Sequence, residues 1–198
     1  MEVVATDGKC LSLYEQNLKE PTNLNLKFIV PIKTIQELNR NLKEEGEVLF
    51  TIGSNQVLFE LNGVVIISRL IEGEFPDYRQ VIPSVSENKF IVERISFLSA
   101  LQRASLLSTP DYQAVKFQLL KNKLILSKST PDIGESYEEL PVKYQGKELV
   151  IGFNPYYLIN VLKNLEDQEV SFELTEPQKP AVLRRQNYLY IVSPMHLG

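Results

Sequence analysis

The side chains best suited to covalent or acid–base chemistry are scarce in this sequence. Cys10 is the only cysteine and His196 the only histidine. A thiol becomes a nucleophile when a base activates it, and no histidine lies near Cys10 in the sequence. The same two counts exclude an internal disulfide and metal centres rich in cysteine or histidine. We therefore expect no catalytic residue, no bound metal and no cofactor.

The carboxylate pairs do not change this expectation. Glu44-Glu45 and Glu138-Glu139 fall at expected loop or strand surfaces, where paired acids are most simply solubilising charges. The sequence contains no glycine-rich phosphate loop, no zinc-ligand spacing and no nucleophile elbow. These patterns favour a binding protein over an enzyme.

Composition and charge limit the possible partners. The 198 residues carry a formal net charge of −4, whereas a generic nucleic-acid binder is usually basic. Contact with DNA would therefore require a local basic face or a protein that encloses the duplex. No run of about 18 apolar residues and no signal peptide is visible, so we expect a cytoplasmic location.

A β-α-β-β-β pattern occurs three times, beginning at Leu26, Lys89 and Glu148. A β-hairpin with an Asp7-Gly8 turn precedes the first copy. The pattern predicts an α+β fold with antiparallel sheets. We expect residues 1–86 to form a domain that lacks its opening strand and helix, and residues 87–198 to form a complete pseudo-symmetric domain.

The first predicted helix is expected to start at Pro31, after a strand over Leu26–Val30. Its apolar stripe repeats at three- and four-residue steps and comprises Ile32, Ile35, Leu38 and Leu42. The stretch from Arg69 to Pro83 joins the two predicted domains. It contains Phe75-Pro76, which favours extended backbone, and it is either a plain linker or the lining of a groove.

Four short segments occur in a distinctive order: Thr6-Asp7-Gly8, Glu72–Tyr78, Ile151–Asn154 and Val192–Leu197. Together with the repeated unit, this order resembles the bacterial β sliding clamp family over essentially the whole chain. The resemblance implies clamp-type domains, with helices on the inner face of a homodimeric ring and sheets outside. It also implies double-stranded DNA, bound without sequence specificity, as a partner, along with a DNA polymerase catalytic subunit, the clamp loader and repair proteins.

By the same resemblance, basic residues on the three helices would face DNA phosphates. They are Lys33, Arg40, Lys43, Arg94, Arg103 and Lys163. Leu106 and Leu107 would retain half of the subunit interface of the ring. Because the family's first domain is absent from this sequence, we expect the chain alone to be a monomer or to associate weakly.

The resemblance also implies a hydrophobic groove that accepts short linear motifs. The matching residues are Thr6, Gly8, Cys10, Leu11, Pro76, Gln80, Val81, Pro180, Ile191, Val192, Ser193, Pro194 and Met195. Leu11, Val81, Val192 and Met195 would form its apolar floor. The family often has basic residues where Cys10 and Gln80 stand, methionine at Ser193 and arginine at His196, so the motif preference stays open.

Two functions from different classes remain at this point. The first is a clamp fragment that tethers polymerase and other factors to DNA. The alternative is a free-standing peptide-binding adaptor that does not encircle DNA. An unrelated enzyme is a weaker third reading, because no acid–base or metal constellation supports it.

Overall fold

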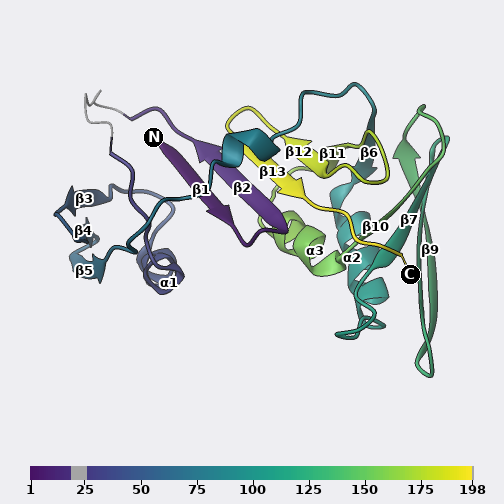
Figure 1. Ribbon diagram of the computed structural model, residues 1–198, viewed down its shortest axis with the longest axis horizontal. Helices are drawn as coiled ribbons and strands as arrows, with labels where there is room; N and C mark the ends of the chain where they lie inside the picture. The colour runs from purple at the N-terminus through teal and green to yellow at the C-terminus, as the bar shows by residue number, and fades with distance from the viewer. Residues whose placement is uncertain (19–25, 198) are drawn as a thin grey trace. The chain divides into compact units, whose positions relative to one another are not determined.

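The computed structural model describes residues 1–18 and 26–197, and these residues fall into two compact units (Figure 1). Unit 1 comprises Met1–Lys19 and Ile82–Gly198, and unit 2 comprises Glu20–Val81. Within the described part of the chain, no helix combines the length and the apolar character needed to cross a membrane.

Unit 1 is built on one long antiparallel sheet and two helices. The strand order is β1-β2-β13-β12-β11-β6-β9-β8-β7-β10. The helices α2 and α3 contact one another, with α2 also packed on β6, β8 and β9 and α3 on β13. The elements are β1 (Glu2–Thr6), β2 (Cys10–Glu15), β6 (Lys89–Glu93), α2 (Arg94–Ser105), β7 (Val115–Leu120), β8 (Lys123–Thr130), β9 (Gly134–Lys143), β10 (Leu149–Phe153), α3 (Pro155–Lys163), β11 (Glu169–Glu173), β12 (Ala181–Arg184) and β13 (Tyr188–Val192).

Two β-α-β-β-β repeats within unit 1 exchange their first strands. The first strand of one repeat, β6, pairs with the second strand of the other, β11. Reciprocally, β10 pairs with β7. Each first strand also touches the end of its own repeat, through Val92 opposite Val142 and through Gly152 opposite Met195. The exchange makes the two repeats interdependent.

Aromatic rings fill the space between the helices and this sheet. Phe97 of α2 is fully buried and meets Phe90, Phe117 and Phe172 at centroid distances of 6.0–6.1 Å. Phe117 in turn meets Phe153 edge to face at 5.2 Å. Residues from both repeats thus share one core, and edge-to-face packing of this kind adds to the free energy gained by apolar burial.

Local sequence signals start the two helices of unit 1. The Glu93 carboxylate accepts hydrogen bonds from the backbone N–H groups of Ile95 and Ser96, which satisfies two groups that a helix leaves free. Asn154 does the same for the N–H of Tyr156 at 3.0 Å, and Pro155 follows as the first helical residue. The predicted start of α3 is confirmed.

Unit 2 contains one repeat and a small core. It holds α1 (Ile32–Asn41), a three-stranded sheet in the order β3-β4-β5, and the short 3₁₀ helix η1 (Tyr78–Val81). The strands are β3 (Leu49–Ile52), β4 (Gln56–Leu61) and β5 (Val64–Arg69). Among the described residues its buried apolar core is limited to Leu38, Val57, Phe59 and Leu61.

The tight turns formed as predicted. Asn62 and Gly63 both have positive φ, at 51° and 78°, as the two-residue turn between β4 and β5 requires. Gly8, with φ at 82°, turns the chain between β1 and β2.

Two predictions in unit 2 are wrong. The expected strand Leu26–Val30 is reduced to a single bridge between Ile29 and Ile71. Helix α1 begins at Ile32 rather than Pro31, because Pro31 has extended backbone at the cap position. On the predicted apolar stripe of α1 only Leu38 is buried, since the described residues of unit 2 contain no second α-helix. Residues 19–25, part of an expected loop, lie outside the described residues.

Candidate functional site

The N-terminal hairpin and the C-terminal segment of the chain are paired in unit 1. Strand β2 lies antiparallel to β13, with Leu11 opposite Ile191 and Cys10 opposite Val192. The pairing continues past the strand, since the Ser193 N–H donates to the Lys9 carbonyl at 2.8 Å. Seven of the predicted groove residues therefore meet at one edge of the hairpin: Thr6, Gly8, Cys10, Leu11, Ile191, Val192 and Ser193.

The last residues are fixed by strand β10. The Met195 N–H donates to the Gly152 carbonyl at 2.8 Å. A Cβ atom at position 152 would lie only 2.6 Å from the Met195 carbonyl oxygen and 2.7 Å from a methyl carbon of Leu197. Glycine at this position therefore allows the backbone of the C-terminal segment to approach β10 closely.

A hydrogen-bonded turn holds the hairpin tip. The Thr6 hydroxyl donates to the Cys10 carbonyl at 2.6 Å and accepts from the Gly8 N–H at 3.1 Å. The Asp7 carboxylate accepts from the N–H groups of Lys9 and Cys10, both at 2.9 Å. Partial burial opposes ionisation of Asp7, but these bonds outweigh it and lower the pKa of its carboxyl group.

The Cys10 thiol is not set up as a nucleophile. Burial raises its pKa, and the neighbouring Asp7 carboxylate, 3.4 Å from the sulfur, adds to the increase. Tyr190 beside it also has a raised pKa, chiefly from burial, and donates its hydroxyl hydrogen to the Tyr157 carbonyl at 3.0 Å. A protonated thiol among protonated phenols can pack and donate hydrogen bonds, but it is a poor attacking group.

Burial separates the predicted groove residues into two kinds. Leu11, Ile191 and Val192 are almost fully buried, so they support the surface from below and leave little area for a ligand. Half-exposed side chains form the accessible part of the site in unit 1: Cys10, Pro180, Ser193, Pro194 and Met195. Pro76, Gln80 and Val81 are exposed residues of unit 2, the last two within η1.

The helix cations differ in their local contacts. Arg94 donates to the carbonyl oxygens of Asp167 and Leu162, at 2.8 and 3.1 Å, and so ties the start of α2 to the end of α3. Arg103 forms a two-pronged ion pair with Glu138 at 2.6 and 2.7 Å. Lys163 is exposed in the last turn of α3.

In unit 2, Arg40 pairs with Glu37 at 3.1 Å, while Lys33 and Lys43 are exposed. Each of the three helices thus carries one cation in its last turn, namely Arg40, Arg103 or Lys163. A cation there also stabilises its helix by opposing the negative end of the helix dipole.

The predicted subunit-interface residues lie at the end of α2. Leu106 is 81% exposed, among the most exposed large apolar side chains described in the chain. Leu107 is half-buried, and its carbonyl accepts from the Thr130 hydroxyl at 2.6 Å. The following loop is held from beneath by the buried Lys128, whose ammonium donates to the carbonyls of Tyr112 and Ala114.

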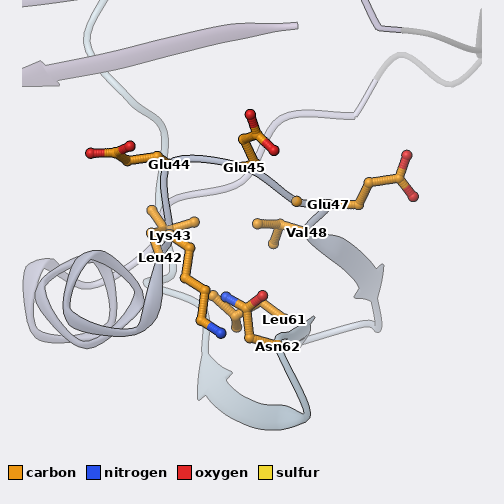
Figure 2. A pocket seen from close by; sticks show the side chains of 9 residues that line it. Leu42, Lys43, Glu44, Glu45, Glu47, Val48, Leu61 and Asn62 are labelled. Carbon is orange, nitrogen blue, oxygen red and sulfur yellow. The ribbon is translucent and has the colours of Figure 1, made fainter.

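A small pocket in unit 2 does not form a second chemical site. It has a volume of about 60 Å³ and lies between the end of α1 and the start of β3. Figure 2 shows the side chains of Glu44, Glu45 and Glu47 pointing away from one another. Within the described residues, no three acidic, cysteine or histidine side chains converge in a way that could hold a metal ion.

Two models of one protein family match nearly the whole chain. Residues 1–77 match the central domain of the DNA polymerase III beta subunit, and residues 79–195 match its C-terminal domain. The chain belongs to the β sliding clamp family. The family is one of non-catalytic polymerase accessory subunits.

The β sliding clamp of Treponema pallidum is 35% identical over 199 residues, covering 97% of this chain and 54% of the relative. The clamp of Pseudomonas aeruginosa is 32% identical over 198 residues, covering 98% and 54%. A crystal structure of the Bartonella birtlesii sliding clamp bound to griselimycin matches with a TM-score of 0.92 at 34% identity, covering 98% of this chain and 54% of that one. The chain thus spans about half the length of the relatives it matches.

Residue patterns missed part of this site. The Asp7-Gly8 pair predicts only a turn, although the Asp7 carboxylate also organises the backbone beneath Cys10. Gly152 lies in the Ile151–Asn154 segment that carries the family resemblance, but that segment does not show that the C-terminal segment returns to β10 there. No pattern marks Tyr157, whose hydroxyl bonds the Asp7 carboxylate of the distant hairpin. Asp-Gly in a hairpin is a usable signal for Asp7.

Proposed function

We propose that this chain acts as part of a sliding clamp, holding a polymerase and other clamp-binding proteins at duplex DNA through a peptide-binding surface. The observation that carries the proposal is the half-exposed patch at Cys10, Pro180, Ser193, Pro194 and Met195, supported by buried Leu11 and Val192. Fixed backbone beneath partly exposed apolar side chains suits a short peptide, because little of the surface must be ordered on binding.

Pro76, Gln80 and Val81 of unit 2 are exposed, and their part in peptide binding stays a separate prediction from the family resemblance. The methionine thioether adapts its shape to different ligands, which suits a surface shared by several partners. We also propose a cytoplasmic location, and a division at residue 86 between the central-domain part and the C-terminal-domain part of the chain.

Calorimetric titration with a family-type peptide tests this function. The peptide carries a glutamine followed by a leucine and a hydrophobic-aromatic end. We expect micromolar affinity, because ordering a flexible ligand offsets much of the gain from apolar burial. Met195→Ala removes apolar contact area and is expected to weaken binding by about 1–2 kcal/mol.

Lys163→Ala is the matched control, because Lys163 lies on a helix outside the patch. It is expected to leave the affinity unchanged. The groove proposal fails if the wild-type protein does not bind, or if Lys163→Ala weakens binding as much as Met195→Ala.

The helix cations support a separate proposal about DNA. Lys33, Arg40, Lys43, Arg103 and Lys163 would contact phosphates without reading sequence. Arg94 contributes less, because its guanidinium already bonds two backbone carbonyls. We expect weak duplex binding that falls steeply between low and physiological salt, and Lys163→Ala should reduce the salt slope by about one. Tight, sequence-specific binding at physiological salt would contradict the proposal.

The second candidate is a free-standing peptide-binding adaptor that does not encircle DNA. Retention on circular DNA separates the two functions. A chain that stays on circular DNA and leaves after linearisation acts as a ring, whereas peptide binding without retention identifies the adaptor.

A further inference from the structure

The stretch of chain that enters unit 1 has little of its own to hold it in place. Residues 82–88 lie between η1 and β6 and belong to no helix or strand. Within the part of the chain that the structure describes, no backbone–backbone hydrogen bond involves residues 83–86. The side chain of Val85 is 75% exposed, so apolar burial does not fix it either. A segment of this kind opens readily unless side chains from elsewhere hold it.

Two charged side chains of the sheet hold this segment. Glu173 ends β11 and Arg184 ends β12. The Arg184 Nε lies 3.1 and 3.3 Å from the two carboxylate oxygens of Glu173. The same guanidinium donates through Nη2 to the Pro83 carbonyl at 2.7 Å, and the Glu173 carboxylate accepts from the Ser86 N–H at 3.2 Å. Each member of the ion pair therefore bonds its partner and one end of the segment.

The anchor at Ser86 continues into regular sheet pairing. The Ser86 hydroxyl accepts from the Asn88 N–H at 3.1 Å, and the Asn88 carbonyl accepts from the Leu174 N–H at 2.9 Å. The next residue, Lys89, begins β6 and lies opposite Glu173 in the antiparallel pair with β11. From Ser86 onward the chain is thus bonded to the end of β11 at every second residue.

The geometry of the ion pair suits holding a segment better than it suits adding stability. Glu173 is 8% exposed, and a pair so little exposed loses hydration that the attraction between its charges often only offsets. The planar guanidinium of Arg184 presents several donors in fixed directions, so it can bond a carboxylate and a carbonyl at once. The bonds from the pair to residues 83–86 are therefore the feature that needs a function.

We propose that Glu173 and Arg184 form a latch that makes residues 83–88 part of the rigid body of unit 1. The latch consists of their ion pair and the two hydrogen bonds that it makes to the segment. It determines which residues of the connecting stretch can move when the two units change their orientation.

A closed latch leaves a very short joint between the units. Unit 2 ends at Val81, and the first latched residue is Pro83, so Ile82 alone lies between them. The proline that follows restricts Ile82 to extended backbone. An open latch would extend the joint over the whole of residues 82–88, and the chain would enter unit 1 only at β6.

Hydrogen exchange of the complete 198-residue chain, followed residue by residue by NMR, tests the latch. The Ser86 amide is the direct probe, because its N–H bonds the Glu173 carboxylate. Arg184→Ala should make this amide exchange at least about tenfold faster. Arg185→Ala is the matched control, since the neighbouring arginine pairs with Asp167 at 2.8 Å instead, and it should leave exchange at Ser86 unchanged.

A second variant separates the latch from the stability of unit 1. Arg184→Ala leaves the buried Glu173 carboxylate without its partner, which by itself destabilises a fold. The double variant Glu173→Met with Arg184→Met removes both charges at similar volume, a change that folded proteins tolerate well. Thermolysin, which cleaves before apolar residues, should cut this variant between Ser84 and Val85 at least about tenfold faster than the wild type.

Each outcome decides the proposal. Faster exchange confined to residues 83–88, with the amides of β7 and β8 unchanged, supports it. The latch is refuted if the Ser86 amide of the wild-type protein exchanges as fast as an unstructured amide, because the segment is then not held. It is refuted equally if the double variant keeps wild-type protection at Ser86, or if Arg185→Ala releases that amide as much as Arg184→Ala does.

Discussion

Gly152 is predicted to control the shape of the peptide-binding surface although it contacts no ligand itself. Replacing it with alanine places a methyl group 2.6 Å from the Met195 carbonyl oxygen and 2.7 Å from the Leu197 side chain. Both distances are too short for real contacts, so either β10 or the C-terminal segment must move. We expect the C-terminal segment to move, because the backbone hydrogen bond from the Met195 N–H to the Gly152 carbonyl holds it against β10. Strand β10 is paired along its length with β7.

The size of the effect follows from two contributions. Forcing a methyl group into a packed contact costs about 1–3 kcal/mol, and losing one backbone hydrogen bond costs about 1 kcal/mol. We expect Gly152→Ala to lower the free energy of unfolding by about 2–4 kcal/mol, measured by urea denaturation. If the segment detaches instead of straining the sheet, the loss will fall at the lower end of that range.

Either route displaces Met195, so peptide affinity should fall at least about tenfold in calorimetric titration, because apolar contact area is lost. Exchange of the Met195 amide hydrogen should become faster in the same variant. Gly53→Ala is the matched control, since an added methyl group there would meet its nearest atoms at an ordinary 3.4 Å. The reasoning is refuted if Gly152→Ala keeps both native peptide affinity and native protection of the Met195 amide.

Three further predictions concern unit 1. Arg94→Ala should lower the free energy of unfolding by about 1.5–3 kcal/mol, because it removes charged hydrogen bonds to two backbone carbonyls. The control Lys163→Ala should change the free energy of unfolding by less than about 0.5 kcal/mol. Equal effects of the two variants in thermal unfolding would be evidence against the Arg94 contacts. Asp7 has a lowered pKa when folded, so its contribution to stability is present above the ordinary value of 3.8 and is lost as the pH falls through the folded pKa. In the Asp7→Asn variant the free energy of unfolding should therefore fall less at acidic pH than in the wild type. An unchanged fall at acidic pH would show that the hydrogen bonds to the Asp7 carboxylate contribute nothing to stability. Cys10, with its raised pKa, should react with a thiol reagent at neutral pH more slowly than free cysteine, and rapid labelling would contradict its placement beneath the hairpin tip.

The sequence alone determined the features that depend on neighbouring residues. Asn62-Gly63 and Asp7-Gly8 specify tight turns because glycine and asparagine tolerate positive φ, and the chain turns at both. Asn154-Pro155 starts a helix because the Asn154 side chain caps it and the proline ring of Pro155 fixes φ near the helical value. The order of the predicted strands and helices likewise revealed the repeated unit, and the order of four short segments revealed the family resemblance.

Tertiary structure decided what each side chain faces. A helical period shows that Ile35, Leu38 and Leu42 share a side of α1, but burial needs a second element against that side, and only Leu38 has one among the described residues. The family resemblance likewise implied Arg94 as a DNA contact, while its guanidinium bonds the end of α3, which is distant in sequence. Leu11 and Val192 look like a groove floor in sequence, yet the pairing of β2 with β13 buries both. Burial and hydrogen-bond partners are set by contacts between distant segments, and the sequence of one segment does not record which other segment will pack against it.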